Sequence, residues 1–280
     1  MSAVYTLRTP RHACTPRDTA RAGDLWRLVQ DAAVQDASDK GWPPERFRAA
    51  GTGFVVREMR AIHHREASYG EALTLRTQVA DHRRDVMMRR ETQVDGVMDA
   101  TADWVHIGRE GSPQRATPEL IAAFPASASA PVLPPLPEPP AGPAAGLAAG
   151  TGSGTALPAF VFSPWWTEMD PLGHTNHPRY VDWADEALSR ALHAAGIDPT
   201  GLVPIAERVR FRAGARAVDT ITVTGHRLGA VVVQTAAGPR PGVAFQFRAR
   251  RGAASAGSAL GTGDVVADMY IVRAHLRSEL

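Results

Sequence analysis

The chain has 280 residues, of which 44% are hydrophobic and 21% charged, a composition typical of globular proteins. Its formal net charge is +2, and Lys40 is the only lysine, so the positive charge is almost entirely arginine. So small an excess does not indicate nucleic-acid binding. The arginines gather in three groups, which we expect either to form solvated strand faces or to meet an anionic partner: 83–84, 89–90, and Arg248 with Arg250 and Arg251.

Cys14 is the single cysteine, so no internal disulfide can form and nothing points to an oxidising compartment. The N-terminal residues lack the basic-then-apolar pattern of a signal peptide, and no apolar run approaches the about 20 residues of a membrane span. We therefore expect a soluble, cytoplasmic protein with no membrane partner.

The first half predicts a long helix followed by strands. Apolar residues recur at helical spacing between positions 25 and 33, and a Gly- and Pro-containing turn at 41–44 ends the helix. Strands are expected at 54–57, at 73–79 and at 102–107. These residues form a domain predicted at 1–125.

Residues 126–157 consist almost entirely of Pro, Ala and Gly, a composition that predicts an extended linker. The second domain, predicted at 158–280, repeats the order of the first, with a helix over 180–191 and strands at 209–212, 221–223 and 267–272.

The two halves read as an internal duplication of a strand, a helix and four strands. Trp26 and Trp183 are 157 residues apart, and so are Phe54 and Phe211. One long helix followed by an antiparallel meander predicts an α+β fold with the sheet wrapped around the helix. We expect the two sheets to pair edge to edge, as in a homodimer fused into one chain.

The densest group of polar residues is Asp170-Pro171-Leu172-Gly173-His174-Thr175-Asn176-His177, directly before the second helix. The spacing Asp-x-x-Gly-His-x-Asn, followed by Tyr180 and Trp183, resembles hotdog-fold thioesterases. The segments 54–60 and 69–77 look like the acyl-ACP thioesterase family. That resemblance implies two hotdog domains in one chain, each an antiparallel sheet wrapped around a long central helix, with the catalytic residues in the second domain.

Three positions depart from the families. Plant-type acyl-ACP thioesterases carry an asparagine where this chain has Leu172, and an acidic residue in the following strand near Gly214. The motif is closer to that of 4-hydroxybenzoyl-CoA thioesterases, although His177 stands in place of their second asparagine.

Within this motif, Asp170 is the candidate general base or nucleophile, since thioester hydrolysis needs a carboxylate to activate water or to attack directly. Its alternative role is a turn ahead of Pro171. His174 is expected to orient the carbonyl, hold a water or act as acid or base. Asn176 either positions a water or caps the helix.

Pro178 suits the first turn of a helix, which makes Asn176 or His177 the cap. The backbone from Gly173 to Asn176, with Thr175 between them, then lies at a helix N-terminus and is expected to form an oxyanion hole. The alternative for Gly173 is a simple turn.

The remaining candidates are weaker. His177 is either a cap or surface residue or part of the substrate site, and Glu186 is either a helix acid of the site or part of a solvated face. Tyr180 and Trp183 lie on the apolar stripe and are expected in the core. In the first half, Asp18 and Asp24 occupy the comparable turn and helix start without a Gly-His, so we expect no site there, but a domain that shapes the acyl pocket.

No metal or other cofactor is expected, because adjacent histidines such as His63 and His64 point to opposite faces of a strand. The main hypothesis is a thioesterase hydrolysing an acyl chain from acyl carrier protein or CoA, in fatty acid or polyketide-type biosynthesis, as a monomer or homodimer. The alternatives are a hotdog dehydratase, lyase or cyclase acting on a carrier-bound chain, and a non-catalytic protein that shelters such a chain.

Overall fold

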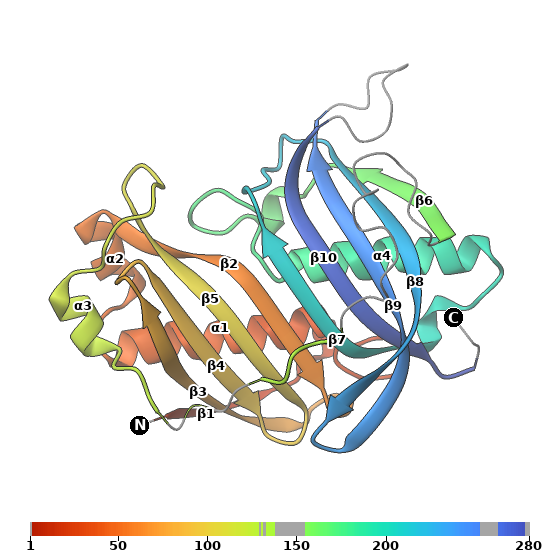
Figure 1. Ribbon diagram of the computed structural model, residues 1–280, viewed down its shortest axis with the longest axis horizontal. Coiled ribbons are helices and arrows are strands. Elements are labelled where there is room, and N and C mark those ends of the chain that lie inside the picture. The colour runs from red at the N-terminus through yellow and green to blue at the C-terminus, as the bar shows by residue number, and fades with distance from the viewer. Residues whose placement is uncertain (1, 129, 131–132, 138–154, 253–262, 278–280) are drawn as a thin grey trace. The chain divides into compact units, whose positions relative to one another are not determined.

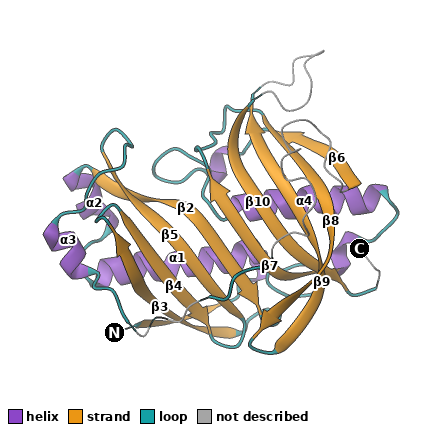
Figure 2. Ribbon diagram, viewed as in Figure 1, coloured by secondary structure: helices purple, strands orange, loops and turns teal. Residues whose placement is uncertain are grey.

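Each half of the chain forms an antiparallel sheet that packs against one long helix (Figures 1 and 2). The computed structural model describes residues 2–128, 130, 133–137, 155–252 and 263–277. They divide into two units, 1–134 and 135–280. The α+β class predicted from the sequence is confirmed.

In the first unit, the described strands pair in the order β1-β3-β4-β5-β2. Its elements, in chain order, are β1 (Ala3–Arg8), η1 (Arg11–Ala13), α1 (Ala22–Asp39), α2 (Pro44–Ala50), β2 (Thr52–His63), β3 (Ala72–Arg83), β4 (Met87–Val94), β5 (Met98–Gly108) and α3 (Pro118–Ala123).

In the second unit, the described strands pair in the corresponding order β6-β8-β9-β10-β7. Its elements are β6 (Thr155–Phe162), η3 (Trp166–Glu168), α4 (Arg179–Ala194), η4 (Pro199–Gly201), β7 (Leu202–Phe211), β8 (Ile221–Thr235), β9 (Gly238–Arg251) and β10 (Asp264–His275). Both units therefore contain the predicted strand, helix and four strands.

The sheet register corrects one correspondence between the halves. The Arg65 N–H donates to the Val97 carbonyl just after β2, and the Ala213 N–H donates to the Val266 carbonyl just after β7. Phe211, two residues before Ala213, therefore corresponds to His63 and not to Phe54. Equal spacing along the chain failed here because the connections between helix and strand differ, with α2 present only in the first unit.

The predicted linker at 126–157 is described only toward its two ends. Residues 138–154 lie outside the described residues, whereas 155–157 begin β6 and pair with β8. At the other end Leu133 and Leu136 are buried, and the carbonyl of Pro137 accepts a hydrogen bond from the Tyr270 hydroxyl at 3.0 Å. Composition missed these ends because strand pairing uses backbone groups and a few apolar side chains suffice for burial.

Both long helices bury the faces that their apolar spacing predicts. In α4 the apolar residues at helical spacing are buried, namely Tyr180, Trp183, Ala184, Ala187, Leu188 and Ala191. In α1 Leu25, Trp26 and Val29 are buried. Burial of each large side chain stabilises the fold by about 1.5–3 kcal/mol.

A buried arginine also joins helix to sheet in each unit. In the first, Arg90 donates to Asp36 of α1 at 2.6 Å. In the second, Arg273 of β10 donates to Asp185 of α4 at 2.7 Å and to Glu207 of β7 at 3.0 Å. Removing one partner would leave an uncompensated buried charge, so these contacts hold each helix at a defined place on its sheet.

Glu91 of β4 makes the stability of the first unit depend on pH. Burial raises the pKa of Glu91 from 4.5 to about 7. Between these values the folded state binds more protons than the unfolded state, so the free energy of unfolding falls as pH rises through this window. We expect Glu91→Gln to be neutral at pH 4 and to stabilise the protein by up to about 3 kcal/mol at pH 8. Thermal unfolding of both proteins at the two pH values measures this, and an equal difference at both would contradict it.

Candidate functional site

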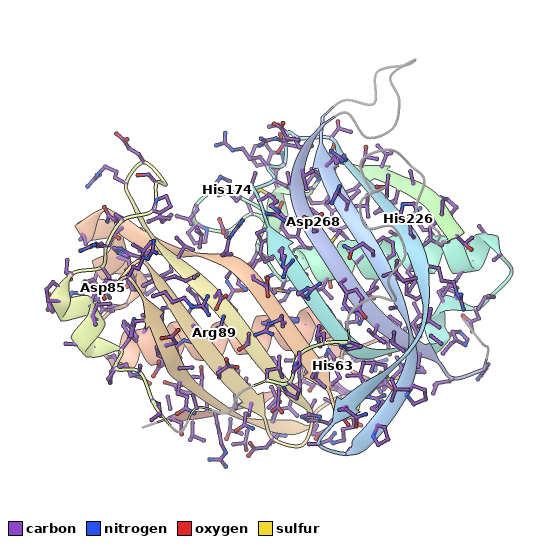
Figure 3. The ribbon with its side chains drawn as sticks, in the orientation of Figure 1. His63, Asp85, Arg89, His174, His226 and Asp268 are labelled. Atoms are coloured by element: carbon purple, nitrogen blue, oxygen red, sulfur yellow. The ribbon has the colours of Figure 1, made fainter. Side chains whose placement is uncertain are left out.

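The polar motif lies in the connection between β6 and α4. Residues 169–176, called here the site loop, form a tight turn (His174 is labelled in Figure 3). Met169 and Thr175 form an antiparallel bridge, and the Asp170 N–H donates to the His174 carbonyl at 2.7 Å. Hydrogen bonds within the loop backbone therefore set the loop conformation, and contacts with the sheet add to them.

The Asp170 carboxylate is held by this turn. Its Oδ1 accepts hydrogen bonds from the backbone N–H groups of Leu172 at 2.9 Å and His174 at 3.2 Å. Among the described residues no hydrogen bond is made to Oδ2. One oxygen therefore orients the half-buried carboxylate, and the other remains for water or a substrate.

Gly173 is required by the turn. Its φ of +75° lies in the left-handed region, and its N–H donates to the Asp170 carbonyl at 2.9 Å. Gly173 therefore has the turn role that the sequence analysis gave as its alternative.

The oxyanion hole expected from the loop backbone is not formed. The Gly173 and His174 N–H groups donate to Asp170, that of Thr175 donates to the Ala215 carbonyl at 2.7 Å, and that of Asn176 to the Glu168 carbonyl at 2.9 Å. The expectation placed these groups at a free helix N-terminus, whereas the loop uses each of them to close on itself and on its neighbours.

Two side-chain atoms of the loop are buried and lack a hydrogen-bond partner, Thr175 Oγ1 and Asn176 Oδ1. Asn176 does not cap the helix, because α4 begins after Pro178, whose own backbone is helical, with no side-chain cap. Unpaired buried polar atoms are rare in proteins and often mark a binding or catalytic site. Both atoms belong to residues that the sequence analysis selected.

The segment that follows β7 completes the surroundings of the loop. The Ala215 carbonyl accepts from Thr175, and the Ala215 N–H donates to the Tyr180 hydroxyl at 3.1 Å. A Cβ built on Gly214 would lie 2.6 Å from the His174 ring, so the imidazole rests directly on the Gly214 backbone. Burial, together with the charge of Asp170, raises the pKa of Tyr180, which therefore stays neutral.

The two remaining candidates make different contacts. The half-buried His177 ring packs edge-on against Phe211, with centroids 6.2 Å apart. Glu186 is exposed and pairs with Arg190 one turn along α4 at 2.7 Å, so it belongs to a solvated face. The neighbouring Asp185 is the acid that α4 turns toward the sheet, and a substrate-binding role of Glu186 stays a prediction.

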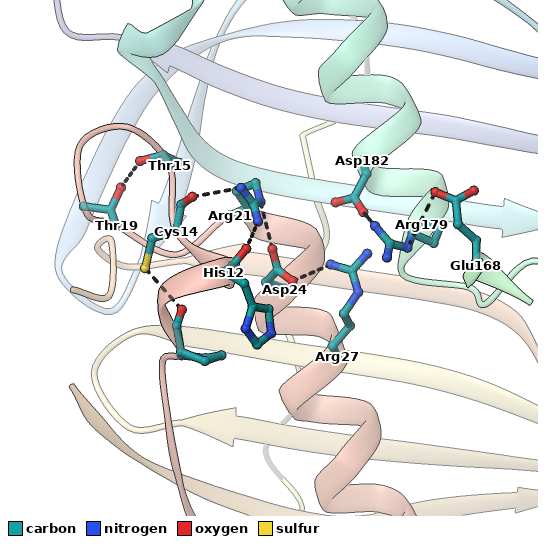
Figure 4. Close-up of polar contacts among 11 residues, drawn as sticks. His12, Cys14, Thr15, Thr19, Arg21, Asp24, Arg27, Glu168, Arg179 and Asp182 are labelled. Atoms are coloured by element: carbon teal, nitrogen blue, oxygen red, sulfur yellow. Dashed lines mark hydrogen bonds and ion pairs between the residues drawn. The ribbon is translucent and has the colours of Figure 1, made fainter. Parts of the chain in front are cut away.

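Large apolar side chains are exposed on and just before the loop, and one arginine follows it. Trp165, Trp166 and Leu172 have exposed side chains, 73%, 75% and 49% respectively. Arg179, the first residue of α4, forms ion pairs with Asp182 at 3.3 Å and with Glu168 at 3.7 Å (Figure 4). These pairs hold η3 and the start of α4 beside the loop.

The first unit contains the same turn with different side chains. Cys14 and Ala20 form the bridge, the Thr15 N–H donates to the Thr19 carbonyl at 2.7 Å, and Asp18 adopts a φ of +60°. The Arg17 N–H donates to Thr15 Oγ1 at 3.2 Å, as that of Leu172 does to Asp170. Asp18 therefore corresponds to Gly173, and Thr15 takes the place of the catalytic candidate Asp170. Figure 4 shows the Thr15 and Thr19 hydroxyls bonded to each other.

The arginine groups expected to meet an anionic partner are largely neutralised by carboxylates. Arg89 pairs with Asp103 at 2.8 Å, Arg248 with Asp268 at 2.7 Å, and Arg90 is buried against Asp36. The solvated-face alternative therefore describes Arg89 and Arg248, whereas Arg90 belongs to the interior.

The histidines of β2 and its end carry no metal site. His64 Nε2 lies 3.1 Å from Asp99 Oδ2. The part of the chain that the structure describes contains no group of three or more His, Cys, Asp or Glu residues arranged to hold a metal ion. Nor does any described helix combine the length and apolar character needed to cross a membrane.

Comparison with known proteins shows what the chain is similar to. A family model described as the Thioesterase superfamily matches residues 172–228, which begin two residues after Asp170. Solved structures similar over nearly the whole chain include three thioesterases. They are a provisionally named oleoyl thioesterase from Lactobacillus plantarum (TM-score 0.74, 16% identity, 99% of this chain and 98% of that one), an acyl-ACP thioesterase from Bacteroides thetaiotaomicron (0.68, 13%, 98% and 98%) and the 12:0-ACP thioesterase of Umbellularia californica (0.70, 13%, 98% and 97%).

At such identities the structures define the fold, which is that of two hotdog domains fused in one chain. The resemblance to double-hotdog thioesterases predicted from the sequence is confirmed at this level. No curated protein matches the sequence significantly.

Sequence reasoning undervalued two residues beside the loop. Tyr180 was expected only in the core, although its hydroxyl also anchors Ala215. Gly214 was noted only as a missing acid, although it supports His174. For Tyr180, its position six residues after the histidine of the motif was a signal in the sequence that it belongs to the site. For Gly214 the sequence held no such signal.

Tyr180 is expected to stabilise the site through its hydroxyl. Tyr180→Phe leaves the buried Ala215 N–H without an acceptor and should cost about 1–3 kcal/mol. Tyr5→Phe is the matched control, since Tyr5 donates to Asp39 in an exposed bond. Chemical denaturation followed by tryptophan fluorescence measures both, and an equal effect of the two changes would contradict the prediction.

Proposed function

We propose that the protein is a thioesterase that hydrolyses an acyl chain carried on a phosphopantetheine arm, with acyl carrier protein as the preferred carrier. One observation carries the proposal. The Asp170 carboxylate is fixed by its own turn beside His174 and two buried, unpaired polar atoms, in a loop matched from Leu172 onward by the Thioesterase superfamily model.

Asp170 supplies the base or the nucleophile through Oδ2. As a base it takes a proton from water, and the resulting hydroxide attacks the thioester carbonyl carbon. The tetrahedral intermediate then expels the thiolate, which receives the proton from Asp170, so that a free acid and a free thiol leave. As a nucleophile it attacks the thioester carbonyl, breaks the C–S bond and forms an acyl anhydride with release of the thiolate. Water then hydrolyses the anhydride to the free acid and protonated Asp170, whose proton passes to the thiolate. In both routes His174 orients the carbonyl or the water.

A side chain, not the loop backbone, is assigned to the developing oxyanion. The loop N–H groups are engaged in the turn, whereas the Thr175 hydroxyl and the Asn176 amide include atoms without a partner. A hydroxyl is a donor as well as an acceptor, so the Thr175 hydroxyl can donate to the oxyanion, whereas the unpaired Asn176 atom is the amide oxygen, an acceptor that suits the attacking water. Such a donor stabilises the transition state by about 3 kcal/mol when it is held in place.

The choice of carrier protein over CoA is supported by two structures of the same fold, those from Bacteroides thetaiotaomicron and Umbellularia californica, which are acyl-ACP thioesterases. A product released in this way suits fatty acid or polyketide-type biosynthesis. The paired arginines of the strands do not contribute to this argument.

Asp170→Asn tests the proposal. The amide oxygen retains the two N–H bonds of the turn, so the fold should persist, while the loss of basicity should lower the rate about 10²- to 10⁴-fold. The measurement is release of free thiol from a panel of acyl-carrier and acyl-CoA thioesters. We expect turnover by the wild type, faster with the carrier-bound substrates.

Thr15→Val is the matched control, because Thr15 holds the equivalent place in the first unit and should leave turnover unchanged. Retention of half the wild-type rate by Asp170→Asn would contradict the assigned role. Loss of water from a hydroxyacyl substrate with the thioester intact would replace hydrolysis by dehydration.

A further inference from the structure

The two units differ most at one position in the segment that packs beneath the loop. In the second unit Gly214 precedes Ala215, whose carbonyl accepts the loop N–H at 2.7 Å. In the first unit Glu66 precedes Ala67, whose carbonyl accepts the Ala20 N–H at 2.8 Å. Glu66 and Gly214 therefore occupy the same place relative to the two turns.

In the first unit this position closes the loop. Glu66 Oε1 accepts from the Thr19 hydroxyl at 2.9 Å and forms an ion pair with Arg17. The side chains of Arg17 and Glu66 are only 20% and 18% exposed. Glu66 is therefore bonded to the side chain of Thr19, the residue that corresponds to His174. No polar group remains open at this place among the described residues of the first unit.

In the second unit both members of that ion pair are absent. Leu172 stands where the first unit has Arg17, and its side chain is half exposed. Gly214 stands in place of Glu66, and the His174 ring fills the space that any Cβ would need. The Cγ and Cδ2 atoms of the ring both lie 2.6 Å from such a Cβ.

Neither backbone can yield to relieve that contact. The His174 N–H and carbonyl are both bonded to Asp170. The Gly214 carbonyl accepts from Arg251 at 3.3 Å, and both backbone groups of the adjoining Ala215 are engaged. A side chain at position 214 would therefore rotate the imidazole away rather than shift the chain.

We propose that Gly214 is a positioning residue for His174, and that the absence of an Arg17–Glu66 type of ion pair keeps the second loop open for substrate. This inference rests on the proposed thioesterase function. Gly214 touches no reacting atom; it acts by allowing the imidazole to lie where the turn and the sheet meet.

Gly214→Ala tests the proposal. We expect thiol release to fall about 10²-fold through kcat, with KM within a factor of about three, because a displacement near 1 Å has that effect on an oriented group. The ring resonances of His174, assigned by comparison with His174→Gln, should shift in a two-dimensional NMR spectrum of the free protein. Gly53→Ala is the control, because a Cβ there meets no atom within 4 Å. It should change neither readout.

Unchanged His174 resonances together with an unchanged rate would overturn the positioning role. Shifted resonances in a protein whose wild type cleaves no thioester would support the role and refute the proposed function, so the two failures are distinguishable. If Gly214→Ala unfolds, the double variant His174→Ala/Gly214→Ala removes the contact. Recovery of the wild-type melting temperature supports the contact, and equal instability of the double variant overturns it.

Discussion

The turn that closes between Met169 and Thr175 is the constraint on which the site depends. It brings the Asp170 carboxylate, the His174 ring and the buried polar atoms of Thr175 and Asn176 into a few residues, and it uses its own N–H groups to do so. The same hydrogen bonds form in the first unit with Thr15 and Thr19, where no site is expected. The turn is therefore a structural feature of both domains. Side chains added to it decide whether it carries chemistry.

Contacts between residues distant in sequence attach this turn to the rest of its domain. Thr175 bonds to Ala215 beyond β7, and the Tyr180 hydroxyl on α4 bonds to the same residue. The buried Arg273 fixes α4 on the sheet through Asp185 and Glu207. A loop on a rigid scaffold of this kind loses little conformational freedom when a substrate binds, which favours precise placement of reacting groups.

Much of this arrangement could be predicted. Apolar spacing located both long helices, and the polar motif before α4 named the loop. The errors share one cause, which is that sequence patterns do not report which groups are already bonded. The loop N–H groups were expected to be free, whereas the turn and its neighbours use all of them. For the same reason the sequence left open whether the strand arginines meet an anionic partner, because it does not show their carboxylate partners.

By itself, the sequence determined the features that act over a few residues. Asp170, Pro171 and Gly173 specify the turn, because an aspartate that bonds the backbone two residues on and a glycine at positive φ are local requirements. Only the tertiary structure decided what lies beneath the loop. Gly214 and Glu66 stand far along the chain from their loops, and strand register and packing bring them there. The difference between an open and a closed copy of one turn therefore depends on contacts that no local pattern encodes.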